Sequence, residues 1–217
     1  MQKGVDKCHL LWYNHNRNEG SDDLKIFVDF DDTLAMSSVT VVQYLNERYG
    51  LNKAASDVHD WCYRSIYRHM TPKMVEDIYA GDYFWENVGL FHDAVDILRG
   101  HEVTVCSCGC SENLRRKAQF LSESNLGYDM AFINTEGGKK SGKDKCEFDM
   151  AGAIQIDDRV DSLLYTNAAV KILFKNGNSH TWQKVPSGAN IYVVDTWEEI
   201  KELLRWFNDN PDFSADR

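Results

Sequence analysis

Short apolar runs alternate along the chain with segments in which apolar residues recur at helical spacing. The segment KIFVDF, residues 25–30, is rich in β-branched and aromatic side chains and leads into acidic residues, a pattern typical of a buried strand. Apolar residues from Ser37 to Tyr49 recur every three or four positions, and Gly50 follows them. This spacing predicts a helix that ends at that glycine.

The next part of the chain, residues 53–81, keeps helical signals and shows no strand signal. Ser56 is a candidate cap for one helix, and Thr71 followed by Pro72 predicts the start of another, which would stop at Gly81. The segment HDAVDILRG then predicts a third, short helix. Helices are therefore expected between the first strand and the second.

From Glu102 onward, strand and helix patterns alternate. In chain order they are a strand at EVTVCS, a helix at SENLRRKAQFLSES, a strand at DMAFIN, a short helix near KCEFDM, strands at GAIQIDD, AVKILF and NIYVVD, and a final helix. Thr196 and Glu199 predict a capping box at the start of that last helix. The alternation predicts an α/β fold, a doubly wound, Rossmann-like parallel sheet with its ligand site at the carboxyl ends of the strands.

The same pattern divides the chain into three parts. Residues 25–36 and 100–217 are expected to form the α/β core. Residues 37–99 are too many for one crossover and lack strands, so we expect them to form a small helical cap inserted after the first strand. Residues 1–24 are polar around a short apolar patch and are interpreted as an N-terminal arm or an extra strand.

Composition limits the partners of such a protein. Of its 217 residues 43% are hydrophobic, enough for a buried core, and the net charge of −10 disfavours nucleic acid as a partner. Small phosphorylated ligands remain compatible with this charge if a metal ion shields them. No apolar run approaches the roughly 18 residues of a membrane span, and no signal-peptide pattern opens the chain. We therefore expect a cytoplasmic protein with no membrane partner.

Three cysteines crowd into the segment VCSCGCS, at Cys106, Cys108 and Cys110. They do not make the framework of a disulfide-rich domain, and no second cysteine or histidine cluster at zinc-finger spacing accompanies them. Reduced, structural cysteines are the favoured interpretation, with a zinc or redox site as the alternative.

Carboxylates follow two of the predicted strands, and a hydroxyl follows a third. In chain order these groups are Asp29, Asp31, Asp32, Ser107, Asp157 and Asp158. Because the carboxyl ends of parallel strands meet at one edge of the sheet, we expect the groups to lie together. Clustered carboxylates need a compensating cation, and hard oxygen ligands favour Mg²⁺, so magnesium is the expected cofactor. Singly, each acidic pair is typical of a turn or a helix cap; the ordered set favours catalysis.

The ordered set resembles the four motifs of the haloacid dehalogenase-like (HAD) phosphatase superfamily. They are the strand with Asp29-Phe-Asp31-Asp-Thr33, the strand-terminal Ser107, a later lysine, and the strand with Asp157-Asp158. The segments FWENVGLFHDAVDIL and KCEFDMAGAIQIDDR resemble the 5′(3′)-deoxyribonucleotidase branch. The resemblance spans Lys25 to Phe207. It departs at CSCG, where nucleotidases tend to carry Thr or Ser, then Ser and Pro.

The resemblance implies a role for each polar group. Asp29 would attack phosphorus to form an aspartyl phosphate, and Asp31 would protonate the leaving oxygen and later take a proton from water. An Asp at this second position argues against the ATPase members, which carry Thr there. Ser107 and a lysine would bind the phosphoryl group; Lys145 is favoured over Lys143 because it stands at the start of the short helix.

The resemblance also implies a set of metal ligands. The side chains of Asp29 and Asp157 and the backbone carbonyl of Asp31 would bind Mg²⁺, whereas Asp158 would orient a water molecule of the metal's shell.

Aromatic side chains of the expected cap are candidates for binding the rest of the substrate. They are Trp61, Tyr63, Tyr67, Tyr83, Phe84 and Trp85. Phe84 and Trp85 are favoured for stacking on a base, because they lie in the segment that resembles the nucleotidase return from cap to core. The alternative is that these aromatics are core residues.

Three functions are compatible with the sequence. The first is a magnesium-dependent phosphomonoesterase on deoxynucleoside monophosphates, with another small metabolite ester as a variant of it. The second is a nucleic-acid end phosphatase, and the third is a non-catalytic binding protein that kept the fold. The expected partner is a small phosphorylated substrate, in the first case a nucleoside monophosphate, and a homodimer stays open.

Overall fold

The computed structural model describes residues 24–138, 140–178 and 180–210. The expected N-terminal arm therefore lies outside the described residues, apart from Leu24.

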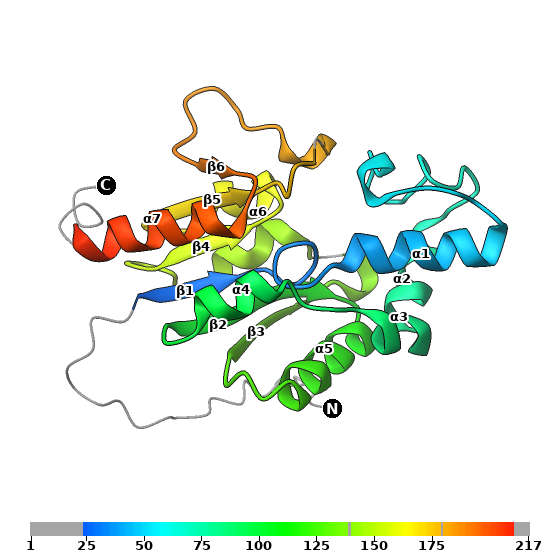
Figure 1. The fold of residues 1–217 in the computed structure, drawn as a ribbon, viewed down its shortest axis with the longest axis horizontal. Helices are drawn as coiled ribbons and strands as arrows, with labels where there is room; N and C mark the ends of the chain where they lie inside the picture. The colour runs from blue at the N-terminus through cyan, green and yellow to red at the C-terminus, as the bar shows by residue number, and fades with distance from the viewer. Residues whose placement is uncertain (1–23, 139, 179, 211–217) are drawn as a thin grey trace, which may run out of the picture.

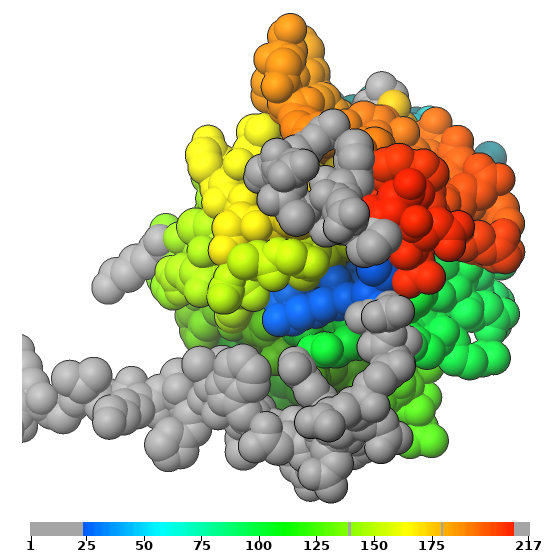
Figure 2. Space-filling view, turned by 90° about the vertical axis from the view of Figure 1, so that its left-hand side faces the viewer, coloured from blue at the N-terminus to red at the C-terminus, as the bar shows by residue number. Residues whose placement is uncertain are grey.

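A parallel sheet forms the centre of the molecule. Among the described residues it has six strands, in the order β3-β2-β1-β4-β5-β6. Their bounds are β1 Lys25–Val28, β2 Glu102–Gly109, β3 Asp129–Asn134, β4 Ile154–Asp157, β5 Val170–Phe174 and β6 Tyr192–Val194. β1, the first of the described strands, is central; in Figure 2 its blue segment lies between green and yellow-green ones. The predicted α/β, doubly wound parallel fold is confirmed.

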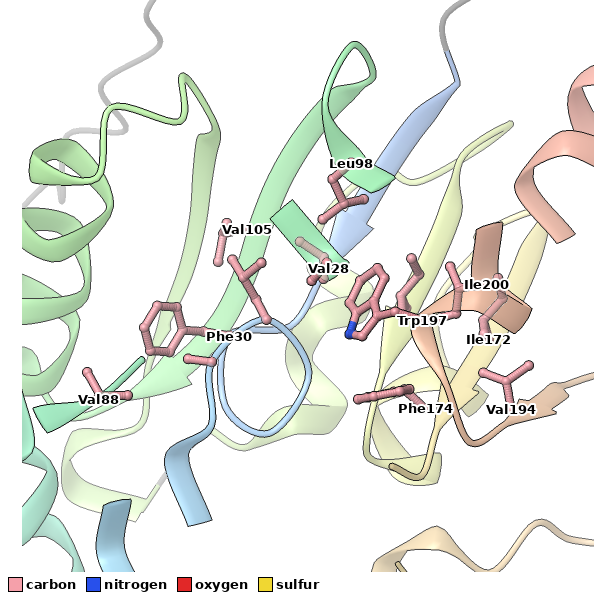
Figure 3. Close-up of a cluster of buried hydrophobic side chains, with 14 of the residues drawn as sticks. Val28, Phe30, Val88, Leu98, Val105, Ile172, Phe174, Val194, Trp197 and Ile200 are labelled. Carbon is pink, nitrogen blue, oxygen red and sulfur yellow. The ribbon is translucent and has the colours of Figure 1, made fainter. Parts of the chain in front are cut away.

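Helices cover both faces of the sheet. Their bounds are α4 His92–Leu98, α5 Ser111–Glu123 and α7 Trp197–Asp209 on one face, and the short α6 Val160–Leu164 on the other. Val28 points to the first face and packs in the main core with Leu98 and Trp197 (Figure 3). Phe27 points to the opposite face and packs with Met150. Alternation along β1 thus buries both faces, as its continuous apolar run predicts.

The helical segment after β1, which is called the cap below, lies beyond the carboxyl end of that strand (Figure 1). It contains α1 Ser37–Tyr49, α2 Pro72–Ala80 and α3 Asp82–Asn87, with a 3₁₀ turn at Ala55–Asp57. Two short paired segments join it to the core: Met36 N–H donates to Gly89 O (2.9 Å), and Phe91 N–H donates to Leu34 O (3.0 Å).

The chain returns to the core earlier than residue 99, the expected end of the cap. α4, which lies inside the expected cap segment, packs against α7 on the sheet. Leu98 places the apolar side of α4 in the main core, so this helix serves the core layer instead of the cap.

The helix prediction holds at both ends of the cap and is wrong in the middle. α1 has the predicted bounds, with Gly50 in the left-handed conformation that suits glycine, and Thr71 Oγ1 caps α2 by accepting from Met74 N–H. Residues 58–71 form turns instead of a helix, and Ser56 lies inside the 3₁₀ turn.

The carboxylate of Asp60 explains these turns. It accepts hydrogen bonds from the backbone N–H groups of Cys62, Arg64 and Ser65, at 3.1, 3.2 and 2.9 Å. A side chain that takes up three N–H groups competes with helical hydrogen bonding. Partial burial raises the pKa of Asp60, but these bonds outweigh it and leave the pKa lowered.

None of the helices in the described part of the chain combines the length and the apolar character that crossing a bilayer requires.

The capping box of α7 gives a test of the fold. Thr196 Oγ1 accepts from Glu199 N–H (3.2 Å), and Glu199 Oε2 accepts from Thr196 N–H (2.9 Å). Thr196→Ala should lower the free energy of unfolding by about 1 kcal/mol, because the helix loses one of these bonds. Chemical denaturation measures this. Glu202→Ala, at an exposed position of α7, is the control; an equal loss in both variants would contradict the capping role.

Candidate active site

Two carboxylates and one lysine meet at the carboxyl ends of β1 and β4. Asp29 directly follows β1, Asp157 is the last residue of β4, and Lys145 comes from the 3₁₀ helix Gly142–Glu147. Lys145 Nζ lies 2.6 Å from Asp29 Oδ1 and 2.6 Å from Asp157 Oδ2. All three side chains are buried, so both ion pairs are shielded from solvent and short.

Asp158 adds a third buried carboxylate. Oxygens of Asp29, Asp157 and Asp158 lie within 4.8 Å of one another. Burial raises the pKa of Asp157 to about 6. The pKa of Asp158 is also raised, mainly by burial and to a smaller extent by the negative charges of Asp157 and Asp29. Burial alone would lower the pKa of Lys145, but the charges of Asp157 and Asp29 hold it well above its ordinary value.

This cluster fits a divalent cation. Three carboxylates face one ammonium group, so Lys145 leaves negative charge uncompensated in a buried place. Oxygen ligands in this number suit Mg²⁺, which takes few protein carboxylates and keeps several waters. Trp182 Nε1 donates to Asp158 Oδ2 (2.8 Å) and orients this carboxylate, as an outer partner does for a metal-site residue.

A second lysine, Lys117 of α5, also reaches the site. It comes from one face of the sheet, whereas Lys145 comes from the other. The side chain of Lys117 is 0% exposed, and its three N–H groups have three acceptors: Asp31 Oδ2 at 2.5 Å, Ser107 Oγ at 2.7 Å and Cys108 O at 3.3 Å. Its ammonium group also lies 5.2 Å from the centre of the Phe30 ring. Lys117 thus joins the two motifs that end β1 and β2.

Lys117 is not among the site residues predicted from the sequence. A signal was present: Lys117 stands three residues after Leu114 and four before Leu121, both buried, so it belongs to the apolar side of α5. A lysine at such a position needs a buried partner. Ser37 was missed too, although its Oγ donates to Asp31 Oδ1 at 2.8 Å.

The side chain of Asp31 does not belong to the cluster of Asp29, Asp157 and Asp158, because it binds Lys117 and Ser37 instead. Lys117 and Ser37 occupy one oxygen each of its side chain. Its expected contribution to a metal, the backbone carbonyl, does not depend on the side chain. Of the two candidate lysines, Lys145 reaches the cluster, whereas Lys143 is exposed, with its ammonium 5.6 Å from the centre of the Tyr165 ring.

A cavity of about 600 Å³ lies over these groups, between core and cap. Its floor includes Asp29, Asp31, Ser107 and Lys145. Aromatic groups at its sides are Trp61, Tyr63 and Tyr79 of the cap and Trp182 of the core. The volume is in the range of small-molecule sites.

Phe84 and Trp85, the aromatics favoured for stacking on a base, do not line this cavity. Phe84 is 0% exposed, and its ring packs against Tyr79 (4.8 Å between centres). Trp85 packs between Phe30 and Phe120, at 5.9 and 5.8 Å. The structure therefore corrects that expectation: helix α3 turns both side chains toward the core of the cap and sheet, and they act as packing residues.

The described cysteines are free thiols. Cys106 is buried in the sheet, and Cys108 and Cys110 line the cavity. Burial raises the pKa of Cys106, and it raises that of Cys108 to about 11, so both stay protonated. Among the described residues, Asp29, Asp157 and Asp158 lie close enough together to hold a metal ion, whereas the cysteines do not form such a group.

Solved structures share this fold. A HAD family hydrolase from Deinococcus radiodurans, with bound phosphate and sodium, is 15% identical over 85% of this chain and 95% of its own, with a TM-score of 0.55. A predicted phosphatase from Clostridium acetobutylicum is 18% identical over 86% of this chain and 100% of its own, with a TM-score of 0.53. A HAD-hydrolase from Bacillus subtilis bound to magnesium is 14% identical over 84% of this chain and 98% of its own, also with a TM-score of 0.53.

No protein-family model and no curated protein sequence matches the chain. The structural likenesses show that the chain has the fold of the HAD hydrolases, the superfamily that its motifs resemble.

The Lys117–Asp31 contact gives a test of the site that needs no substrate. Lys117→Met should lower the free energy of unfolding by about 3 kcal/mol, because Asp31 loses its cation. In a protein that already carries Asp31→Asn, the same change should cost much less. Denaturant unfolding of the two single variants and the double variant measures the coupling.

Lys201→Met is the matched control for that cycle. Lys201 pairs with Glu198 on the surface of α7 (2.9 Å), where an ion pair contributes about 1 kcal/mol at most. Losses from Lys117→Met and Asp31→Asn that add within about 0.5 kcal/mol would contradict the coupling.

Proposed function

We propose that the protein is a metal-dependent phosphomonoesterase that works through an aspartyl phosphate on Asp29. The observation that carries the proposal is the buried group of Asp29, Lys145, Asp157 and Asp158 at the floor of an open cavity. Such a group combines a nucleophile with fixed positive charge, which phosphoryl transfer requires.

The first step is attack by a carboxylate oxygen of Asp29 on phosphorus. A bond forms between this oxygen and phosphorus, and the bond from phosphorus to the ester oxygen breaks. Lys145 offsets the charge that Asp29 shares with the phosphoryl oxygens, and Ser107 Oγ–H donates to one of them. Ser107 accepts from Lys117, so its own hydrogen remains available for this bond.

Asp31 carries the proton. It gives a proton to the departing ester oxygen, and in the second step it takes one from the water that attacks the aspartyl phosphate. The water oxygen then bonds to phosphorus, the bond to Asp29 breaks, and inorganic phosphate leaves. Ser37 and Lys117 hold the Asp31 side chain in position for both transfers.

A bound divalent cation would neutralise charge on the phosphoryl oxygens and on Asp29. Asp29 and Asp157 would hold it through their side chains and Asp31 through its carbonyl, with Asp158 on a water of its shell. Magnesium is the cation that this oxygen-only set favours. The HAD-hydrolase from Bacillus subtilis bound to magnesium supports the choice.

Nucleoside monophosphates are the proposed substrate class, with other small metabolite esters as the alternative. The resemblance of two segments to deoxyribonucleotidases supports it, and so does a cavity with Trp61 and Trp182 at its sides. Trp61 is 50% exposed, so its face is available to a planar ligand. The net charge of −10 favours such a small ester over the end of a nucleic acid.

The nucleophile can be tested directly. Asp29→Asn should lower kcat on an aryl phosphate by about 10³-fold or more, because an amide neither attacks phosphorus nor binds a cation as well. The control is Asp93→Asn, at an exposed position of α4, which should keep full activity. Near-normal turnover by a folded Asp29→Asn protein would contradict the mechanism.

Metal dependence is a separate prediction. A chelator should abolish activity and Mg²⁺ should restore it, whereas Ca²⁺ should inhibit because its higher coordination number lets it take a second carboxylate oxygen of the nucleophile. Mg²⁺ should also raise the melting temperature of the native chain but not that of an Asp157→Asn variant. Undiminished activity in excess chelator would exclude the metal's role.

A further inference from the structure

A chain of hydroxyl groups connects the end of β1 to the cap. Ser38 Oγ donates to Asp32 Oδ2, and Ser38 N–H donates to Asp32 Oδ1 at 2.7 Å. The Tyr63 hydroxyl lies 3.0 Å from Ser38 Oγ, and the Tyr79 hydroxyl lies 3.0 Å from that of Tyr63. All four residues line the cavity that holds Asp29 and Lys145.

Counting hydrogens fixes the direction of this chain. A hydroxyl has one hydrogen to donate, and Ser38 gives its hydrogen to Asp32. Tyr63 must therefore donate to Ser38, and Tyr79 must donate to Tyr63. The Tyr79 hydroxyl, the last of this row, then has no hydrogen left to donate. Its oxygen can only accept a hydrogen bond from a ligand.

Both phenols keep their hydrogens near neutral pH. Burial is the first cause that raises the pKa of each, and the neighbouring negative charges raise it further. The count therefore does not depend on ionisation of either tyrosine.

The two tyrosines are held firmly. Tyr63 has a φ of 56°, a left-handed conformation that a bulky residue adopts only when its surroundings impose it. The backbone carbonyl of Tyr79 accepts from Trp85 Nε1 at 2.8 Å and from Asn113 Nδ2 at 3.2 Å. Trp85 and Asn113 thus fix Tyr79 to the rest of the cap and to α5.

We propose that the Tyr79 hydroxyl oxygen is a specificity-determining acceptor that selects phosphate esters whose leaving group carries a hydroxyl or N–H donor. The inference rests on the proposed function and narrows its substrate class. An ester with a hydroxyl or N–H group next to Tyr79 can donate a hydrogen bond to the Tyr79 oxygen. An ester with an ether oxygen there places two acceptors, the ether oxygen and the Tyr79 oxygen, against each other, and neither has a donor. A site built around a hydrogen bond discriminates strongly against a ligand that cannot make it.

Matched pairs of esters test the proposal. The pairs are glycerol phosphate with its methyl ethers, and deoxynucleoside monophosphates with their sugar methyl ethers. In at least one pair, kcat/KM for the hydroxyl member should exceed that for the ether by about 10-fold or more.

Two single-atom variants separate this role from a structural one. Tyr79→Phe removes the acceptor, so the preference for the hydroxyl member should disappear. Tyr63→Phe releases the hydrogen of Tyr79, which can then donate to an ether oxygen, so the ether should become the better substrate relative to the native protein. Tyr67→Phe, in the same cap but stacked on Tyr49 (4.1 Å), is the matched control and should keep the native preference.

A binding measurement keeps this test independent of the proposed function. If no aryl phosphate is turned over with any divalent metal, the proposed function fails, and calorimetry with the same ester pairs then tests the acceptor by affinity. Equal kcat/KM and equal affinity within every pair would overturn the proposal. So would absence of binding by all pairs, or a native preference that survives Tyr79→Phe.

Discussion

Buried negative charge at the carboxyl ends of β1 and β4 is the constraint on which the rest of the structure depends. Carboxylates there repel one another and lose hydration, so they persist only with positive charge in contact. The two faces of the sheet supply it separately: Lys145 approaches Asp29 and Asp157 from the side of the 3₁₀ helix, and Lys117 approaches Asp31 from α5. Asp29 and Asp31 therefore pair with different lysines, which gives these two acids different environments and allows them different roles.

The cap is connected to this charged floor through hydrogen bonds as well as through its linkers. On one side, Asp32 and Ser38 lead to the two cavity tyrosines. On the other, His180 Nδ1 lies 2.5 Å from Val58 O, and Thr181 Oγ1 donates to His59 O at 3.2 Å. The ring of His180 stacks on Trp182, whose indole N–H reaches Asp158. The position of the cap and the orientation of the Asp158 carboxylate are thus joined through one short segment, residues 180–182.

Local sequence was sufficient for the order of the strands, for several of the helices and for the strand-end groups of the candidate site. β1, α1 and α7 follow from the spacing of apolar residues and from caps such as Gly50 and Thr196, which act within a few residues. The carboxylates and Ser107 could be placed together because they lie at or near the carboxyl ends of strands, which parallel strands bring to one edge; β2 itself continues two residues past Ser107. Residues 58–71 could not be predicted in the same way, since the turns there depend on which backbone N–H groups donate to one carboxylate, that of Asp60.

What the sequence alone determined is the α/β fold and the strand-end groups, because both depend on local periodicity and on a general rule of parallel sheets. The tertiary structure decided which side chains meet the cavity. Lys117 follows two arginines in the sequence; its spacing from Leu114 and Leu121 places it on the apolar side of α5, but only the packing of that helix brings it to Asp31. In the same way Phe84 and Trp85 became packing residues and Tyr79 a cavity residue. The physical reason is that an aromatic residue shows the same sequence pattern whether it packs in the core or lines a binding site. Contacts between segments far apart in the chain decide which of the two it does.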